Sequence, residues 1–390
     1  MKSYGEAFAA DKCNGCGACL KGCPYQGMGI KEAKEGIRRL IDGTDVDVYL
    51  DSCVICGKCN HRCPTAANPL ALILERFRGR RDKEKRTPRP LVYLMNGVCG
   101  GAEEKNFFTD IYRAHNKEEK RIIEQWSLPK EGEDLFFCGC MARISPKDVE
   151  QSAVLSALPK FGGPLDCCGV YAAKSGLYDR AEANAKDMIA RLSQSRFKRL
   201  VLPCGTCQEV FTHIYPQYLG IEFPFEVISI YEYLQEKLQR GELRIQRKWD
   251  LDAALADSCF GYELGDQYLH TIGQLCADVG IKTTELFHKG KSNACCGTNG
   301  FLRKGRPLDI IDAGRLRGQD IRQAGKKDIV TYCQGCFLAL YALQFRRRTH
   351  YLLEKILWSL GDEPRPAKAM IGKMINPYSI SSFIRVMASG

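Results

Sequence analysis

Two runs of four cysteines near the N-terminus constrain this 390-residue chain more than any other feature. The first run is CNGCGACLKGCP from Cys13, and the second is CVICGKCNHRCP from Cys53. Each has the spacing C-x2-C-x2-C-x3-C-P, which is typical of proteins that bind two ferredoxin-type [4Fe–4S] clusters. A pair of zinc sites is a much weaker interpretation, because zinc proteins usually present two separated C-x2-C pairs.

The last cysteine of each run is expected to bind the cluster of the other run, since the proline after it turns it away from its own loop. This predicts one cubane [4Fe–4S] cluster on Cys13, Cys16, Cys19 and Cys63, and a second on Cys53, Cys56, Cys59 and Cys23. We expect Gly15, Gly17 and Gly57 to let backbone N–H groups approach the sulfurs. For His61, a surface position or a contact outside the ligand set is favoured over ligation.

The segments around these runs indicate helices. Residues 30–43 have helical periodicity with few β-branched residues, and residues 69–77 resemble a second helix. An α-helical ferredoxin domain is therefore expected over residues 1–75. Residues 76–132 are interpreted as a basic linker and approach segment, in which 76–90 form a solvated linker, 91–97 a strand and 106–126 one helix. The alternative for residues 76–90 is a basic strip that docks on a partner or on anionic lipid.

The rest of the chain repeats one cysteine pattern, in a first unit at 133–249 and a second at 250–390 with a C-terminal tail. Each unit has a strand-like segment ending in cysteine, then a Cys-Cys-Gly, then a C-x2-C. From the Cys-Cys pair to the C-x2-C the step is 36 residues in the first unit (Cys168 to Cys204) and 37 in the second (Cys296 to Cys333). This agreement predicts two copies of one module.

Short apolar runs alternate with helical segments at 178–192 and 308–324, so each unit should be a small α/β module with a mainly parallel sheet. Ligand sites in such sheets gather at the carboxyl ends of strands, and each cysteine is expected to follow a strand directly. The first set of thiols is Cys140, Cys167, Cys168, Cys204 and Cys207, and the second is Cys259, Cys295, Cys296, Cys333 and Cys336. Adjacent cysteines would strain an ordinary cubane, so an unusual cluster is predicted. Cys99 and Cys276 are expected to be plain buried thiols.

The repeated C…C-C-G…C-x2-C pattern resembles the CCG domain of the catalytic B subunit of heterodisulfide reductase, and the N-terminal part is similar to the C subunit of that enzyme. Together they resemble the fused D-type subunit, and also the iron–sulfur subunits of glycolate oxidase and anaerobic glycerol-phosphate dehydrogenase. The resemblance covers about residues 10–345. It implies an α-helical ferredoxin domain followed by two α/β CCG domains, and a non-cubane [4Fe–4S] cluster on each thiol set.

The sequence departs from the pattern of this family in two places. The step from Cys140 to Cys167 is 27 residues, which is short, whereas the step from Cys259 to Cys295 is 36. Cys138 and Ser258 also stand where the family usually has proline. The outermost ligand of the first set is therefore open between Cys138 and Cys140, with Cys140 preferred.

The expected function is that of an oxidoreductase subunit. The segment GVCGGAEE lacks the G-x-G-x-x-G spacing, so neither NAD nor flavin is expected in this chain, and a flavoprotein subunit of a larger redox complex should deliver the electrons. The resemblance implies that the second set, Cys259, Cys295, Cys296, Cys333 and Cys336, is catalytic and reduces a disulfide-type acceptor. The alternative is a pure electron conduit from a flavoprotein dehydrogenase or a bifurcating complex to quinone or another acceptor.

The charge of the chain, formally +11, does not favour nucleic acid as a partner. A cubane with four thiolate ligands carries a charge of about −2, so two of them offset part of this surplus. No apolar run reaches roughly 18 residues and the N-terminus lacks the apolar core of a signal peptide, which predicts a cytoplasmic protein. Basic segments at 344–350 and 365–387 could dock on its complex or on the inner face of a membrane.

Overall fold

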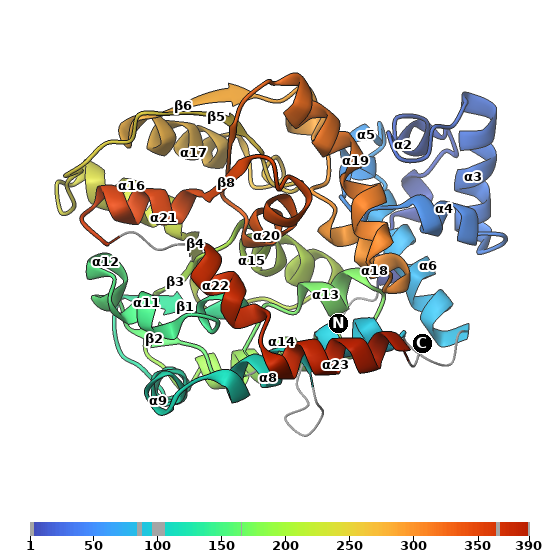
Figure 1. Ribbon diagram of the computed structural model, residues 1–390. Coiled ribbons are helices and arrows are strands. Elements are labelled where there is room, and N and C mark those ends of the chain that lie inside the picture. Colours follow the sequence, from blue (N-terminus) through green and yellow to red (C-terminus); the bar gives the residue numbers. More distant parts are fainter. Residues whose placement is uncertain (1–3, 84–87, 96–105, 165, 364–366, 389–390) are drawn as a thin grey trace.

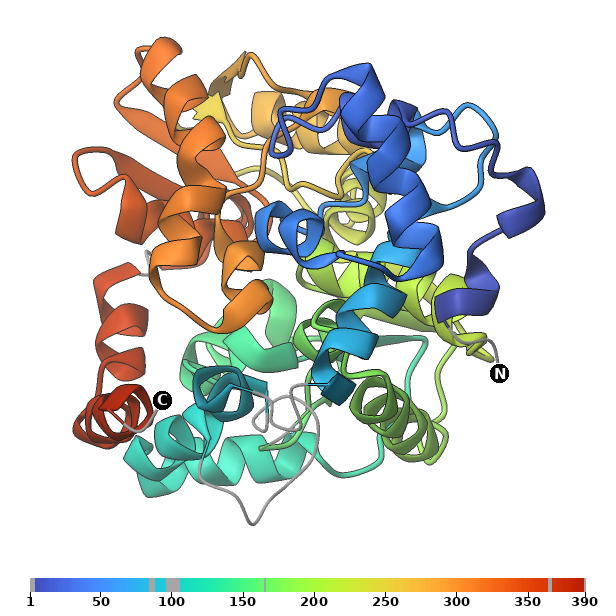
Figure 2. The same cartoon turned by 90° about the vertical axis from the view of Figure 1, so that its right-hand side faces the viewer.

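The computed structural model describes residues 4–83, 88–95, 106–164, 166–363 and 367–388 (Figure 1). A helical N-terminal region lies at one side of the molecule, against the helices α18 (Phe301–Lys304) and α19 (Leu308–Gln323). Two α/β units, each with its own sheet, form the rest (Figures 1 and 2). None of the described helices combines the length and the apolar character that crossing a membrane requires.

The regular secondary structure described in residues 4–83 is helical, as predicted. Its elements are α1 (Tyr4–Ala7), η1 (Ala10–Lys12), α2 (Ala18–Lys21), α3 (Ile30–Asp42), α4 (Asp47–Ser52), α5 (Lys58–Arg62) and α6 (Pro69–Lys83). Helix α3 buries Ala33, Ile37 and Leu40, which lie on one face at helical spacing. The Glu32 carboxylate accepts a hydrogen bond from the backbone N–H of Gly29 at 3.0 Å and caps the start of the helix.

The interpretation of residues 76–90 as a solvated linker is wrong for residues 76–83, because helix α6 continues to Lys83. Arg81 is buried and donates hydrogen bonds to the carbonyl oxygens of Ser175, Leu302 and Arg303, at 2.8–3.2 Å. The sequence around Arg81 is dense in charge, and it does not reveal that this side chain binds carbonyl groups at least 94 residues further along the chain. Residues 84–87 lie outside the described part of the chain.

We expect Arg81→Met to lower the free energy of unfolding by about 2–4 kcal/mol, because three buried carbonyl groups would lose a charged donor. Arg78→Met, on the same helix, is the matched control. Arg78 is 35% exposed and 3.9 Å from Glu75, so its loss should cost less than about 1 kcal/mol. Anaerobic denaturant unfolding followed by circular dichroism measures both, and equal destabilisation by the two variants would contradict the prediction.

Two further expectations for the segment before the first sheet are wrong. Residues 91–95 of the predicted strand at 91–97 belong instead to helix α7 (Arg89–Met95), in which Pro90 occupies the first turn, where proline needs no hydrogen-bond partner, and residues 96 and 97 lie outside the described part of the chain. The single helix expected at 106–126 is two, α8 (Phe107–Ala114) and α9 (Lys117–Trp126). The Asn116 side chain accepts a hydrogen bond from the backbone N–H of Glu119 at 2.9 Å. This bond caps α9, so a new helix begins there.

The two α/β units have the same sheet topology, which confirms the repeat. The first sheet has the order β2-β1-β3-β4 and contains β1 (Asp134–Phe137), β2 (Lys160–Phe161), β3 (Arg199–Leu202) and β4 (Glu226–Ser229). The second has the order β6-β5-β7-β8 and contains β5 (Leu251–Leu255), β6 (Ile281–Glu285), β7 (Asp328–Thr331) and β8 (Arg348–Tyr351). All the strand pairs are parallel, as expected.

Helices cover the two sheets. In the first unit they are α10 (Gly139–Ala142), α11 (Pro146–Glu150), α12 (Ala153–Ser156), α13 (Val170–Lys174), α14 (Tyr178–Leu192), α15 (Gly205–Glu209), the π-helix η2 (Val210–Tyr218) and α16 (Ile230–Gln239). The second unit adds α17 (Asp266–Asp278), η3 (Gly290–Ser292), η4 (Thr298–Gly300), α20 (Gln334–Leu343) and α21 (Leu352–Ser359). The predicted helices at 178–192 and 308–324 are confirmed as α14 and α19. The tail forms α22 (Ala367–Met374) and α23 (Pro377–Ala388), and α23 packs on α7 and α8.

The two units pack against each other through long-range contacts near their central strands. The Tyr231 hydroxyl donates to the carbonyl oxygen of Tyr332 at 3.0 Å, and the Tyr351 hydroxyl donates to that of Pro203 at 2.6 Å. One apolar cluster contains residues of both sheets. These contacts bring the carboxyl end of β3 to the carboxyl end of β7.

Candidate iron–sulfur site

Thiols of the two N-terminal runs lie near one another. Burial, together with the charges of the Cys63, Cys13 and Cys16 thiolates, raises the pKa of the Cys19 thiol to about 12. Burial likewise raises the pKa of Cys53 to about 12, and the Cys23 thiolate makes the largest charge contribution to this rise. Each of these two thiols is thus influenced by a thiolate of the other run. The ligand roles themselves remain predictions.

Backbone geometry in these loops brings N–H groups to the sulfurs. The N–H of Ile55 donates to Cys53 Sγ and that of Ala67 to Cys63 Sγ, both at 3.3 Å. Gly17 has a φ of +74°, and a Cβ there would lie 2.7 Å from the backbone of Ala33. Hydrogen bonds to sulfur stabilise thiolate ligands of iron, so the loops suit a cluster.

His61 lies at the boundary between the N-terminal region and the second unit. Its Nε2 atom is 3.4 Å from Glu263 Oε1, and its ring stands edge-on to Tyr262. The side chain thus contacts the second unit, and its place outside the ligand set remains a prediction.

We expect Cys63→Ser to damage the cluster on Cys13, Cys16 and Cys19, although Cys63 belongs to the other run. Cys23→Ser should damage the cluster on Cys53, Cys56 and Cys59 in the same way. Electron paramagnetic resonance of the two reduced variants distinguishes the clusters by their separate signals. Loss of the cluster that is adjacent in sequence would refute the crossed assignment.

The Cys-Cys pairs of the two units do not follow strands directly, contrary to expectation. Cys167 lies six residues beyond the end of β2, and Cys295 ten residues beyond the end of β6. Both pairs sit in loops that end at a glycine with positive φ, Gly169 at +72° and Gly297 at +116°. A Cβ at Gly297 would lie 2.4 Å from the carbonyl oxygen of Ile310, so only glycine lets this loop pack on α19.

All ten thiols of the two sets line one cavity between the units. Interacting thiols form a continuous series, in the order Cys140, Cys167, Cys168, Cys207, Cys204, Cys333, Cys336, Cys296, Cys295 and Cys259. The two sets meet at Cys204 and Cys333, whose sulfurs are 4.0 Å apart. Sequence reasoning expected two separate sites and did not place them side by side.

The contact between the two sets is reciprocal. Thr206, in the C-x2-C of the first unit, has its Oγ1 atom 3.1 Å from Cys333 Sγ. Gln334, in the C-x2-C of the second unit, donates its backbone N–H to Cys204 Sγ at 3.4 Å. Each C-x2-C turn therefore supplies a polar contact to the cysteine of the other unit.

The structure separates the two candidates for the outermost position of the first set. The Cys140 thiol interacts with Cys167 and lines the cavity. Cys138 is fully buried in the apolar cluster on the other side of β1, and it is not among the cavity-lining residues. Cys276 is a buried thiol, as expected, and Cys99 lies outside the described residues.

Basic side chains that sequence reasoning missed lie beside the thiols. The contact with Cys167 and burial raise the pKa of Cys140, and the charge of Arg143 opposes this rise; Arg143 also donates to the carbonyl oxygen of Gly139 at 3.2 Å. Lys174 acts in the same sense on Cys259, and its amine is 2.9 Å from Glu209 in a fully buried ion pair. Buried cations of this kind compensate the negative charge of a thiolate-ligated cluster.

The N-terminal region touches the second thiol set directly. The backbone N–H of Cys295 donates to the Tyr25 hydroxyl at 2.8 Å, and Val54 and Cys295 belong to one small apolar cluster. Buried Lys58 donates to the carbonyl oxygen of Gly290 at 3.1 Å, and the thiolates of Cys56 and Cys259 both act on its amine. The second cysteine run and the second thiol set are therefore neighbours. One feature of the sequence could have pointed to Lys58, namely its position between Cys56 and Cys59 in a C-x2-C motif.

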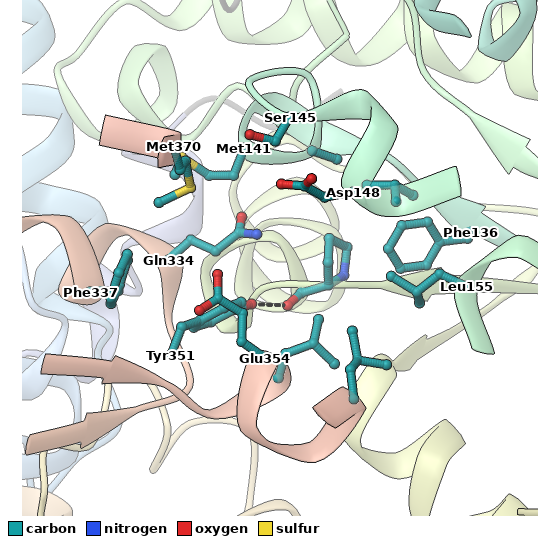
Figure 3. Close-up of a pocket in the computed structure, with 15 residues that line it drawn as sticks. Phe136, Met141, Ser145, Asp148, Leu155, Gln334, Phe337, Tyr351, Glu354 and Met370 are labelled. Atoms are coloured by element: carbon teal, nitrogen blue, oxygen red, sulfur yellow. Dashed lines mark hydrogen bonds between the residues drawn. The ribbon is translucent and has the colours of Figure 1, made fainter. Parts of the chain in front are cut away.

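A further cavity of about 80 Å³ borders the thiol cavity between the two units (Figure 3). Met141 and Gln334 line both cavities. In Figure 3 the Gln334 side chain points inward between Asp148 and Glu354, and the dashed line is the hydrogen bond from Tyr351 to Pro203.

The donor set fits iron–sulfur clusters. The twenty cysteines that the structure describes are all free thiols. Among the same residues, no three or more His, Cys, Asp or Glu side chains converge on one point as the ligands of a single metal ion would. Thiols that bind different irons of one cluster need not converge in this way. The free thiols are thus available as ligands of iron–sulfur clusters.

Comparisons with known proteins agree with this chemistry. A family model described as a 4Fe-4S dicluster domain matches residues 12–67, and one described as a cysteine-rich domain (CCG) matches residues 135–212 and 254–341. Together these matches cover more than half of the chain.

Relatives match most of the chain at low identity. The B subunit of the fumarate reductase (CoM/CoB) of Methanothermobacter marburgensis is 22% identical over 86% of this chain and 68% of that protein. The D subunit of the dihydromethanophenazine:CoB–CoM heterodisulfide reductase of Methanosarcina barkeri is 23% identical over 85% of this chain and 88% of that protein. A crystal structure of a hypothetical protein from Helicobacter pylori covers 87% of this chain and 68% of that chain, with a TM-score of 0.49 and 11% identity. The chain therefore belongs to the iron–sulfur proteins that combine a 4Fe–4S dicluster domain with two CCG domains, and it is similar to the D subunit of heterodisulfide reductase.

Proposed function

We propose that this chain is a component of a redox complex that carries electrons from a flavoprotein partner to a disulfide-type acceptor. Two cubane [4Fe–4S] clusters on the N-terminal cysteines would receive the electrons, and two non-cubane [4Fe–4S] clusters on the ten thiols would deliver them. The names of the relatives, which are subunits of reductases, support a role within a complex. No flavin or NAD is assigned to this chain.

The observation that carries this proposal is the single cavity lined by all ten thiols. Cleavage of a disulfide takes up two electrons and two protons and yields two thiols. Clusters of this kind supply electrons singly. Two thiol sets that meet at Cys204 and Cys333 allow two electrons to be stored at one place, next to one bound acceptor.

The order of transfer follows from the neighbours of the second thiol set. Cys295 contacts Tyr25, and Lys58 lies between Cys56 and Cys259. We therefore assign the cluster on Cys53, Cys56, Cys59 and Cys23 as the donor to the second set. The cluster on Cys13, Cys16, Cys19 and Cys63 would be the point of entry.

The proposal is tested by reduction with dithionite, removal of excess reductant, and addition of a panel of low-molecular-weight disulfides. The wild-type protein should be reoxidised with formation of two thiols per disulfide. Cys296→Ala should abolish this reoxidation while the cubane signals persist, and Cys276→Ala, a buried thiol outside the cavity, should behave as wild type. If no disulfide reoxidises the wild-type protein while a quinone does, the chain is an electron conduit and the disulfide proposal is wrong.

A further inference from the structure

A second and much larger cavity borders the thiol cavity on another side. It has a volume of about 480 Å³ and is lined by α7, α8, α19, α20 and α23. Tyr171, Thr298, Gly335 and Leu338 line both this cavity and the thiol cavity, so the two are contiguous. Cavities of this size commonly hold small-molecule ligands.

The lining of this cavity is almost entirely apolar. It contains Phe107, Phe301, Ile310, Leu343 and Phe383, together with alanine and proline residues. It contains no lysine, arginine, aspartate or glutamate side chain among the described residues. A charged acceptor would lose its hydration here without gaining an ion pair, whereas an apolar one would gain from burial.

The few polar groups of the cavity are near the thiols or already bonded. Thr298 Oγ1 is 3.4 Å from Cys296 Sγ and donates to the carbonyl oxygen of Gly335 at 3.1 Å. The Tyr93 hydroxyl donates to Asp110 at 2.9 Å. Tyr171 stands where the two cavities join. Polarity is therefore concentrated at the thiol end, as a molecule with a reactive head and an apolar body would require.

The elements around the cavity also present apolar side chains to solvent. Leu308 and Ile311 of α19 are 74% and 56% exposed, and Ile384 of α23 is 60% exposed. Ile311 lines the cavity as well, so these exposed groups continue its apolar surface outward. An apolar molecule can enter here along an apolar surface.

We infer that this cavity binds the acceptor, and that the acceptor is an uncharged molecule with an apolar body; the inference rests on the electron-carrying role proposed above and not on the choice between a disulfide and a quinone. Two classes of acceptor have such an apolar body, namely alkyl-substituted quinones and dialkyl disulfides. Each takes up two electrons and two protons on reduction, to a quinol or to two thiols. The electrons come from the reduced clusters and the protons from solvent.

The test compares acceptors of similar size and opposite polarity on the dithionite-reduced protein. The apolar arms are a decyl-substituted benzoquinone and dihexyl disulfide, and the charged arms are a sulfonated quinone and a dicarboxylate disulfide. At least one apolar arm should reoxidise the protein at lower concentration than its charged counterpart, and the arm that does so identifies the source. Equal or better use of the charged arms would overturn the inference.

Variants that block the cavity make the test specific. Ala342 of α20 is exposed and lines the cavity, so Ala342→Trp should fill it without disturbing the core. We expect the half-saturating concentration of the apolar acceptor to rise by about tenfold, because excluding even two methylene groups weakens apolar binding by that order. Ala277→Trp, at an exposed alanine of α17 outside the cavity, is the matched control. Iron content and cubane signals report whether each variant is intact.

A second pair of variants adds a charge in place of bulk. Ile311→Glu puts a carboxylate at the cavity, and Leu128→Glu is a control at an equally exposed position, since both side chains are 56% exposed. Only Ile311→Glu should weaken use of the apolar acceptor. If both members of either pair behave alike, the cavity is not the acceptor site.

Failure of this inference is distinguishable from failure of the proposed function. Calorimetric titration of the oxidised protein with the same quinone and disulfide measures binding without any electron transfer. Binding that is weakened by Ala342→Trp supports the cavity even if no acceptor reoxidises the protein. Reoxidation that is unaffected by Ala342→Trp supports the proposed function and overturns the cavity.

Discussion

Anaerobically purified protein should contain about 16 iron atoms per chain, four for each of two cubane and two non-cubane clusters. The physical reason is the supply of free thiols, eight in the N-terminal region and ten around one cavity. Chemical iron analysis against protein concentration makes the measurement. A value near eight would mean that the ten thiols hold no clusters, and the proposed catalysis would fall with them.

Substitutions sharpen this expectation at the first thiol set. Cys140→Ala should lower the iron content by about four atoms, because Cys140 interacts with Cys167 at the cavity. Cys138→Ala should retain all the iron. Cys138 is two residues before Cys140, but it is buried in the apolar cluster. The pair is closely matched in sequence and differs in placement. Iron loss in Cys138→Ala with full iron in Cys140→Ala would reverse the assignment.

Lys58→Met should lower the reduction potentials of the clusters assigned to Cys56 and Cys259. Burial lowers the pKa of Lys58 to about 8, so its amine is still charged at pH 7, between the two sets of thiolates. Reduction adds negative charge, which a nearby cation stabilises. At an effective dielectric constant of about 20, a unit charge some 8 Å away contributes about 2 kcal/mol. That energy corresponds to a shift on the order of 50–100 mV for one electron.

Potentiometric titration at pH 7, followed by electron paramagnetic resonance, measures this shift. Lys31→Met, at an exposed position on α3, removes the same charge from a solvated site and is the control. The cluster on Cys13, Cys16, Cys19 and Cys63 should move less than the other two in Lys58→Met. Equal shifts of all clusters, or equal shifts in the two variants, would show that Lys58 has no special position.

Local patterns predicted much of the fold because they reflect local physics. The helices at 178–192 and 308–324 follow from helical periodicity, and the parallel sheets follow from short apolar runs between helices. The same reasoning failed at 91–95, where a short apolar run forms part of helix α7 instead of a strand. Short apolar runs do not distinguish a strand from a buried helix, and only the packing of α7 beside α8, α18 and α23 decides between them.

Local patterns could not show how the parts of the chain meet. Arg81 is buried because carbonyl groups of two other segments accept its hydrogen bonds. The sulfurs of Cys204 and Cys333 are neighbours because Tyr231 and Tyr351 bond across the two units. Neither contact leaves a trace in the sequence near the residues concerned.

The sequence by itself determined the chemistry of this protein, because the spacing of thiols along a tight loop decides which irons they can reach. It determined the two cysteine runs, the two five-thiol sets and the repeated α/β unit. Only the tertiary structure decided that both sets line one cavity, that Tyr25 and Lys58 join the second run to it, and that an apolar cavity opens beside it. The reason is that such contacts depend on the packing of whole units, where many weak apolar contacts between distant residues set the distances between atoms.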